Sequence, residues 1–205
     1  MVNIIVLCTT FLLFLLVFAI VIRSIFQKIP LIGRPPIPVF FFILAKILVL
    51  ANLSFLLMKG LGIGFFRLFE PVTYLELIAL VLLVSGTIIL FITTFQLNKD
   101  LIFGLSESQK HKLQTGGVYS ISRHPFYLGF IFILFSSCIF YPNPLNIIAF
   151  FGAWFIHHFI MIKEEEYLTL QYGDEYRQYL KNVNRYITMK RNNHERIDHL
   201  RSSQS

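Results

Sequence analysis

The stretch from Phe126 to Ile162, FYLGFIFILFSSCIFYPNPLNIIAFFGAWFIHHFIMI, holds two apolar runs separated by the tripeptide Pro142-Asn143-Pro144. Prolines at this spacing interrupt a helix and favour a tight turn. The two runs, Phe126 to Tyr141 and Leu145 to Ile162, are therefore predicted to form an antiparallel helical hairpin. The start of its first helix and the end of its second must then lie side by side.

Three longer apolar runs precede this hairpin, at about Ile4 to Ile22, Val39 to Met58 and Val72 to Leu97. A helix needs about 20 mainly apolar residues to cross the hydrocarbon core of a bilayer. The sequence therefore predicts an all-α integral membrane bundle of about five transmembrane helices, followed by a cytoplasmic C-terminal helical segment. Within the third run, Ser85-Gly86-Thr87 is typical of close helix packing in lipid.

The composition supports a membrane protein. Apolar residues make up 56% of the 205 residues and charged residues 14%, and the mean hydropathy is +0.67. Soluble domains carry about 25% charged residues, so a water-soluble domain is excluded. The net charge of +7 raises the alternative of nucleic-acid binding. With five spans, however, 15 of the 18 Lys and Arg residues fall on one side. By the positive-inside rule this predicts an external N-terminus and a cytoplasmic C-terminus, and no nucleic-acid partner.

Three regions are expected along the chain. Residues 1–97 form an N-terminal three-helix membrane region. Residues 98–190 form the catalytic and cofactor-binding region, made of the hairpin and the C-terminal helices. Residues 191–205 are a polar tail.

The predicted hairpin brings two polar strings together, Arg123-His124-Pro125-Phe126-Tyr127 and Lys163-Glu164-Glu165-Glu166-Tyr167. Pro125 suits the first turn of a helix, whose positive end favours an anion. Three adjacent carboxylates near lipid are costly unless cations partner them. The second helix is expected to continue to Tyr172 and to end at Gly173. The two strings predict a pocket for an amphiphilic ligand that carries both a carboxylate and a cationic group.

Other kinds of site are disfavoured. The pair His157-His158 with the nearby glutamates offers too few ligands, so no metal is expected. The chain has no Gly-rich phosphate loop and no Gly-x-Ser-x-Gly elbow. The near-helical stripe of Tyr172, Tyr176 and Tyr179 is typical of a face that packs on the membrane surface. It continues with Val183, Tyr186 and Ile187.

Taken as a set, three elements carry a resemblance. They are GGVYSISRHPFYLG at Gly116–Gly129, Glu164-Glu165, and Tyr172-Gly173-Asp174-Glu175-Tyr176 with the downstream Tyr179, Val183 and Arg185. This set resembles the isoprenylcysteine carboxyl methyltransferase and phospholipid methyltransferase superfamily of integral-membrane enzymes. The resemblance covers roughly Lys110 to Ile187, and the first three helices match it only in hydropathy.

The resemblance implies S-adenosylmethionine as cofactor, bound at the cytoplasmic ends of the last two helices. The implied cofactor-binding residues are His111, Lys112, Leu113, Gln114, Tyr119, His124, Pro125, Phe126, Tyr127 and Glu164. Glu164 would lie near the α-ammonium of the methionine part. The candidates for a direct part in the chemistry are Arg123, His124 and Glu165. His124 or Glu165 would act as the base that an amine or thiol acceptor requires.

The partners implied are the lipid bilayer and a lipophilic small molecule or prenylated acceptor. The prenylcysteine enzymes carry an Arg one turn before the Glu-Glu pair, where this chain has Ile160. This departure argues against a prenylcysteine carboxylate as acceptor. Two alternatives stay open: an NADPH-dependent membrane reductase related to sterol reductases, and a non-catalytic membrane protein or transporter of the same fold. The greater length of the sterol reductases argues against the first.

Overall fold

A computed structural model describes residues 1–27, 33–64, 66–97 and 113–188 of the chain. Within these residues the chain is all-α, with no β-strand. The elements are α1 (Val2–Gln27), α2 (Val39–Leu61), α3 (Thr73–Leu97), the short 3-10 helix η2 (Gly117–Ser120), α4 (Pro125–Phe140), α5 (Pro144–Tyr172) and α6 (Asp174–Asn182). The predicted helical bundle is confirmed. The predicted polar tail, residues 191–205, lies outside the described residues.

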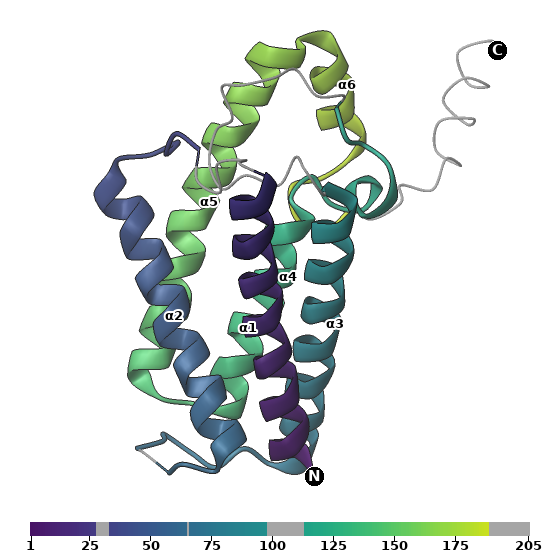
Figure 1. Ribbon diagram of the computed structural model, residues 1–205. Coiled ribbons are helices and arrows are strands. Elements are labelled where there is room, and N and C mark those ends of the chain that lie inside the picture. The colour runs from purple at the N-terminus through teal and green to yellow at the C-terminus, as the bar shows by residue number, and fades with distance from the viewer. Residues whose placement is uncertain (28–32, 65, 98–112, 189–205) are drawn as a thin grey trace, which may run out of the picture.

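The five apolar helices lie side by side and alternate in direction (Figure 1). Helices α1, α2, α3 and α5 are long and apolar enough to cross a membrane, which makes the chain a multi-pass membrane protein. Helix α4 is also apolar but has 16 residues. At 1.5 Å per residue it spans about 24 Å, less than the roughly 30 Å of a hydrocarbon core. Helix α5, by contrast, extends beyond the other helices and carries α6 at that end (Figure 1).

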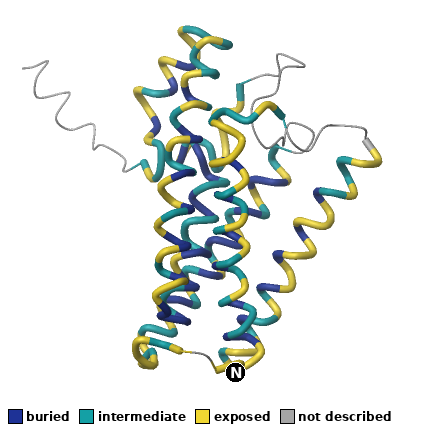
Figure 2. The backbone as a smooth tube through the Cα atoms, turned by 90° about the vertical axis from the view of Figure 1, so that its left-hand side faces the viewer, coloured by how far each residue is buried: buried dark blue, intermediate teal, exposed yellow. Residues whose placement is uncertain are grey.

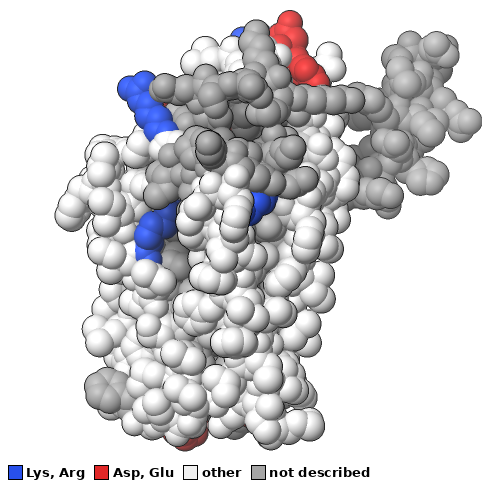
Figure 3. All heavy atoms as spheres, viewed as in Figure 1, with Lys and Arg blue, Asp and Glu red and all other residues white. Residues whose placement is uncertain are grey.

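The exposed surface of the bundle is apolar, as a lipid-facing protein requires. Buried residues form stripes along each helix, and exposed residues occupy the opposite faces (Figure 2). Large apolar side chains fill these exposed faces, among them Phe40, Val81 and Phe151. On the face seen in Figure 3, the charged groups lie between the top and about the middle of the molecule, and at its lower edge. The body between them carries no charge over most of the lower half.

Helices α3 and α4 approach closely at a pair of glycines. A Cβ atom added to Gly86 would lie 2.7 Å from the carbonyl oxygen of Gly129, and one added to Gly129 would lie 2.9 Å from that of Gly86. Small residues permit such backbone contact between membrane helices. The expected close packing at Ser85-Gly86-Thr87 is confirmed, and it holds the start of α4 against α3.

The predicted hairpin is confirmed, with α4 ending at Phe140 and α5 beginning at Pro144. Asn143 caps α5, because its Oδ1 accepts a hydrogen bond of 2.9 Å from the Leu145 N–H. Its Nδ2 donates to the carbonyl oxygen of Phe66 at 2.6 Å and so ties the turn to the α2–α3 connection. Helix α5 ends at Tyr172, as expected, and Gly173 follows with a φ of 58°.

Candidate functional site

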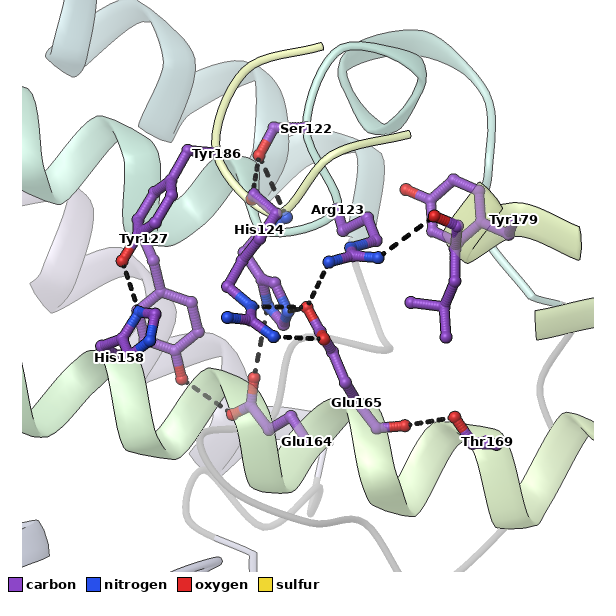
Figure 4. A network of polar contacts seen from close by, with 12 residues as sticks. Ser122, Arg123, His124, Tyr127, His158, Glu164, Glu165, Thr169, Tyr179 and Tyr186 are labelled. Atoms are coloured by element: carbon purple, nitrogen blue, oxygen red, sulfur yellow. Dashed lines mark hydrogen bonds and ion pairs between the residues drawn. The ribbon is translucent and has the colours of Figure 1, made fainter. Parts of the chain in front are cut away.

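The hairpin brings the start of α4 against the last turns of α5 (Figure 4). His124 lies between two carboxylates of α5. Its Nε2 is 3.1 Å from Glu165 Oε1, and its Nδ1 is 3.6 Å from Glu164 Oε2. The two polar strings that the sequence placed together do meet, and the arginine and histidine of the first face the glutamates of the second.

The turn just before α4 is held by Ser122, which the sequence did not indicate as a site residue. Ser122 Oγ accepts a hydrogen bond of 3.1 Å from the His124 N–H. The same hydroxyl donates to the carbonyl oxygen of Arg185 at 2.9 Å, which joins this turn to the segment after α6. The Arg123 N–H also donates to the carbonyl oxygen of Asn184 at 3.0 Å. Two segments about 60 residues apart therefore hold His124 in place.

Glu165 contacts two arginines and the imidazole of His124. Arg185 donates from Nε to Oε1 at 2.9 Å and from Nη2 to Oε2 at 2.8 Å. Arg123 Nη2 lies 3.2 Å from Oε1, and His124 Nε2 contacts the same oxygen. Hydrogen bonds to Glu165 raise the pKa of the Arg185 guanidinium above its usual value. Buried charges are tolerated when they are paired in this way, and the carboxylate is fully engaged in ion pairs.

Glu164 has a different environment. Its Oε1 accepts a hydrogen bond of 2.7 Å from the Tyr127 hydroxyl, and its contact with His124 is longer than that of Glu165. Its side chain is 18% exposed, against 11% for Glu165. In its hydrogen bonds and ion pairs described here, Glu164 contacts a tyrosine hydroxyl and one imidazole, and Lys46 adds a longer-range electrostatic interaction. Two guanidinium groups contact Glu165. Glu164 is thus the carboxylate better placed to receive a cationic ligand.

The turn before α4 is held by α3 and α6. Gln96 at the end of α3 donates from Nε2 to the carbonyl oxygen of Gly116 at 2.7 Å and accepts from the Val118 N–H at 3.3 Å. The Tyr179 hydroxyl donates to the carbonyl oxygen of Tyr119 at 2.6 Å. Burial raises the pKa of Tyr179, which keeps this hydroxyl protonated as a donor.

Five of the expected site residues meet in the network of Figure 4: Arg123, His124, Tyr127, Glu164 and Glu165.

Other expected site residues lie beside this network or outside what the structure describes. Phe126 packs edge-on against Phe130, with 5.1 Å between ring centroids. Leu113 packs on a cluster made by Tyr176, Tyr179 and Val183, and Gln114 is exposed. Two further expected residues, His111 and Lys112, lie outside the described residues.

The aromatic stripe after α5 has a role other than the one expected. Tyr176, Tyr179 and Val183 are at most 7% exposed and form an internal cluster against Leu113 and Leu168. The interpretation of this stripe as a membrane-surface face is therefore wrong for these three residues. Helical spacing identifies one apolar side of a helix, but not whether lipid or protein covers that side.

Besides Ser122, two residues of this site are not predicted by the sequence. Arg185 belongs to the motif that carries the resemblance, but only the three adjacent carboxylates indicate that further cations must lie near them. Gln96 gave no signal, because its partners belong to a turn 20 residues away. Within the described part of the chain, no group of three or more His, Cys, Asp or Glu side chains is arranged to hold a metal ion.

Comparison with known proteins assigns this region to a family of enzymes. Residues 75–175 match the family model described as phospholipid methyltransferase. The match begins in α3, includes the whole hairpin and ends just after Gly173. It therefore contains Arg123, His124, Tyr127, Glu164 and Glu165, but not Arg185. No solved structure matches the chain.

Several curated proteins are similar over part of their length. Methanethiol S-methyltransferase 1 of Bradyrhizobium diazoefficiens is 30% identical over 116 residues, which cover 52% of this chain and 40% of that protein. Protein-S-isoprenylcysteine O-methyltransferase of Xenopus laevis is 30% identical over 117 residues, covering 56% and 41%. The Saccharomyces cerevisiae protein of the same name is 38% identical over 74 residues, covering 36% and 31%. The matched part thus spans less than half of each of these three relatives.

Proposed function

Since residues 75–175 make this chain a member of the isoprenylcysteine and phospholipid methyltransferase superfamily, we propose that it is a membrane methyltransferase that uses S-adenosylmethionine. The methyl group would pass to a lipid-like or isoprenyl-type acceptor through a carboxyl, amine or thiol group. The names of two relatives include one thiol and one carboxyl acceptor class, methanethiol and isoprenylcysteine.

The observation that carries the proposal is the asymmetry of the two carboxylates at His124. Glu165 is neutralised by two arginines, whereas Glu164 is more exposed and bonded to a tyrosine hydroxyl. A zwitterionic amino-acid moiety requires a carboxylate for its ammonium group and donors for its carboxylate. The N-terminus of α4, which begins at Pro125, supplies a positive dipole end beside Glu164. The residues present thus fit the methionine part of the proposed cofactor.

Each residue of the network has a proposed role. Glu164 binds the ammonium of the donor, and Tyr127 orients that carboxylate through its hydrogen bond. Glu165, paired with Arg123 and Arg185, positions His124 and so fixes the start of α4. A carboxylate with this many cationic partners is a weak base, so we assign Glu165 a positioning role in place of proton transfer.

When bound, S-adenosylmethionine would supply a methyl group on an activated sulfonium. Transfer is a direct displacement, so the protein acts mainly by aligning the acceptor and by excluding water. The methyl carbon would bond to the acceptor atom while its bond to sulfur broke, with the electron pair staying on the sulfur. His124 would hold the proton that an amine or thiol acceptor releases.

The prenylcysteine acceptor stays disfavoured. Ile160, which stands where those enzymes carry an Arg, is fully buried among Phe42, Ala45 and Ile156 of α2 and α5. No cation can be supplied from this position. We also propose the orientation that the basic residues indicate, with the N-terminus outside and the site on the cytoplasmic side.

Calorimetric titration of the purified full-length chain in neutral detergent tests the function. Wild type is expected to bind S-adenosylmethionine and its demethylated product saturably. Glu164→Gln should weaken both by roughly tenfold or more, because it removes a charge-assisted hydrogen bond. Glu166→Gln is the matched control, since Glu166 is exposed and pairs with Lys163.

The same titration separates the alternatives. Binding of NADPH in place of S-adenosylmethionine would establish a reductase and remove the proposal. Binding of neither would favour a non-catalytic membrane protein. Transfer of labelled methyl groups to membrane lipids, followed by mass analysis of the product, would then identify the acceptor.

A further inference from the structure

A histidine lies on the lipid-facing side of helix α5. His158 is partly exposed, and its neighbours on the same face, Trp154, Phe155 and Phe159, are 37%, 58% and 46% exposed. His158 lies seven residues before Glu165, which is about 10 Å along the helix toward the middle of the bundle. Polar side chains of membrane helices normally face the bundle interior, so an imidazole on the outer face marks a candidate site.

The segment after α6 holds one nitrogen of this imidazole (Figure 4). The Tyr186 hydroxyl is 2.7 Å from His158 Nδ1, and the two rings stack with 6.0 Å between their centroids and 14° between their planes. Tyr186 directly follows Arg185, which the two-point contact with Glu165 fixes in place. The imidazole is therefore held in one orientation by a partner that is itself anchored.

The contact with Tyr186 decides which nitrogen of the imidazole carries the proton. Burial raises the pKa of Tyr186, so its hydroxyl stays protonated. The indole N–H of Trp154, which can only donate, also interacts with this hydroxyl. Among the described residues the hydroxyl has His158 Nδ1 as the acceptor for its own proton. The neutral imidazole of His158 therefore carries its proton on Nε2.

The Nε2–H of His158 has no hydrogen-bond partner within the part of the chain that the structure describes. An N–H group without an acceptor is costly in an apolar environment, and the exposed rings around it are apolar. Its acceptor must therefore belong to a molecule that is itself mainly apolar. The carbonyl oxygen of an acyl chain meets this requirement, because it accepts the hydrogen bond while its hydrocarbon part covers the exposed rings.

We propose that His158, held by Tyr186, binds the carbonyl oxygen of an acyl lipid whose chain lies over Trp154 and Phe159. Both of these rings contact the imidazole, each with 6.2 Å between centroids. A fatty acid and a fatty acyl ester present the same oxygen to Nε2–H. The site lies on the outer face of α5, and the inference does not depend on the proposed function.

The single tryptophan of the chain provides the readout, because Trp154 packs on His158. Brominated chains quench tryptophan fluorescence on contact. The full-length protein in an alkyl maltoside detergent, which carries no carbonyl group, would be titrated with dibrominated stearic acid, its methyl ester and dibrominated octadecane. Wild type is expected to be half-quenched by at least one of the two carbonyl compounds at a roughly fivefold lower mole fraction than by the hydrocarbon. The compound that acts at the lowest mole fraction shows whether the lipid is a free acid or an ester.

Variants assign this preference to the imidazole N–H. His158→Phe keeps an aromatic ring but removes the donor, so it should abolish the preference. His158→Gln should retain it, because the amide offers an N–H. Phe159→Leu is the matched control, since it alters the apolar surface for all three probes alike and should leave the ratio of their half-quenching mole fractions unchanged.

Equal quenching by the three probes in wild type overturns the inference, and this comparison needs no variant to fold. A preference that survives His158→Phe overturns it as well. Calorimetry with S-adenosylmethionine keeps the two proposals apart, because His158→Phe should bind this cofactor as wild type does. If His158→Phe unfolds at the wild-type temperature but does not bind the cofactor, His158 serves the donor and the inference is wrong. If wild type does not bind the cofactor, the proposed function fails, and the quenching comparison still decides on the lipid site.

Discussion

Arg185 and Glu165 form a two-point ion pair between the segment after α6 and the last turns of α5, with donor–acceptor distances of 2.9 and 2.8 Å. The planar guanidinium fits both oxygens of the carboxylate at once, which adds directional specificity to the charge attraction. Because Glu165 also contacts Arg123 and His124, this pair joins the C-terminal segment to the start of α4. The geometry of the proposed donor site thus depends on a segment that lies outside the family match.

Arg185→Gln is expected to loosen the C-terminal segment. The change removes two charge-assisted hydrogen bonds and should lower the free energy of unfolding by about 1–3 kcal/mol. Thermal unfolding in detergent measures the loss, and limited proteolysis after Asn182 should become faster. Arg177→Gln is the control, because Arg177 pairs with Asp174 on the surface with 65% and 87% of the two side chains exposed. Equal stability of the two variants would show that the Glu165 pair has no anchoring role.

Replacing Glu165 should mainly lower stability, whereas replacing Glu164 should mainly lower the affinity for the cofactor. Glu165→Gln leaves Arg123 and Arg185 without their shared anion and should cost about 3 kcal/mol of stability. Glu164→Gln should change the melting temperature little but weaken cofactor binding. Comparing melting temperature and calorimetric affinity for both variants tests the assignment. A stability loss at Glu164 with intact binding would reverse the two roles.

Gly86→Leu is expected to separate α3 from α4. A Cβ at Gly86 already meets the Gly129 carbonyl oxygen at 2.7 Å, so a larger side chain forces the helices apart. The melting temperature should fall by several degrees, corresponding to roughly 1–3 kcal/mol. Gly64→Ala is the matched control, because no atom lies within 4 Å of the Cβ that it adds. The same melting temperature for both would contradict the close contact.

Gln96→Ala should release the turn that precedes α4. The amide of Gln96 bonds both Gly116 and Val118, and its loss leaves the turn with the contact from Tyr179. Affinity for S-adenosylmethionine is expected to drop severalfold, while the thermal stability of the bundle changes by less than about 1 kcal/mol. Ser120→Ala serves as control, because the Ser120 hydroxyl bonds only locally to Gly117 in the contacts described. If Gln96→Ala binds S-adenosylmethionine with wild-type affinity, the turn that Gln96 holds does not contribute to the donor site.

Residue spacing and hydropathy alone determined where the helices of this protein lie in the sequence. They also determined that the polar strings at residues 123–127 and 163–167 lie side by side. Pro142 and Pro144 force a short turn between two apolar runs, so Arg123 and His124 must meet Glu164 and Glu165 whatever the other helices do. Gly173 likewise ends α5 where its conformational freedom predicts. These features are local, because each depends on residues within one or two turns of chain.

Tertiary structure alone decided which carboxylate is neutralised and which stays accessible. Glu164 and Glu165 are adjacent and chemically alike, and only the docking of Arg185 from beyond α6 tells them apart. In the same way, Lys46 meets His157, 111 residues away in the sequence, only because α2 packs on α5. Such choices depend on side-chain packing between distant segments, on which hydropathy and spacing carry no information.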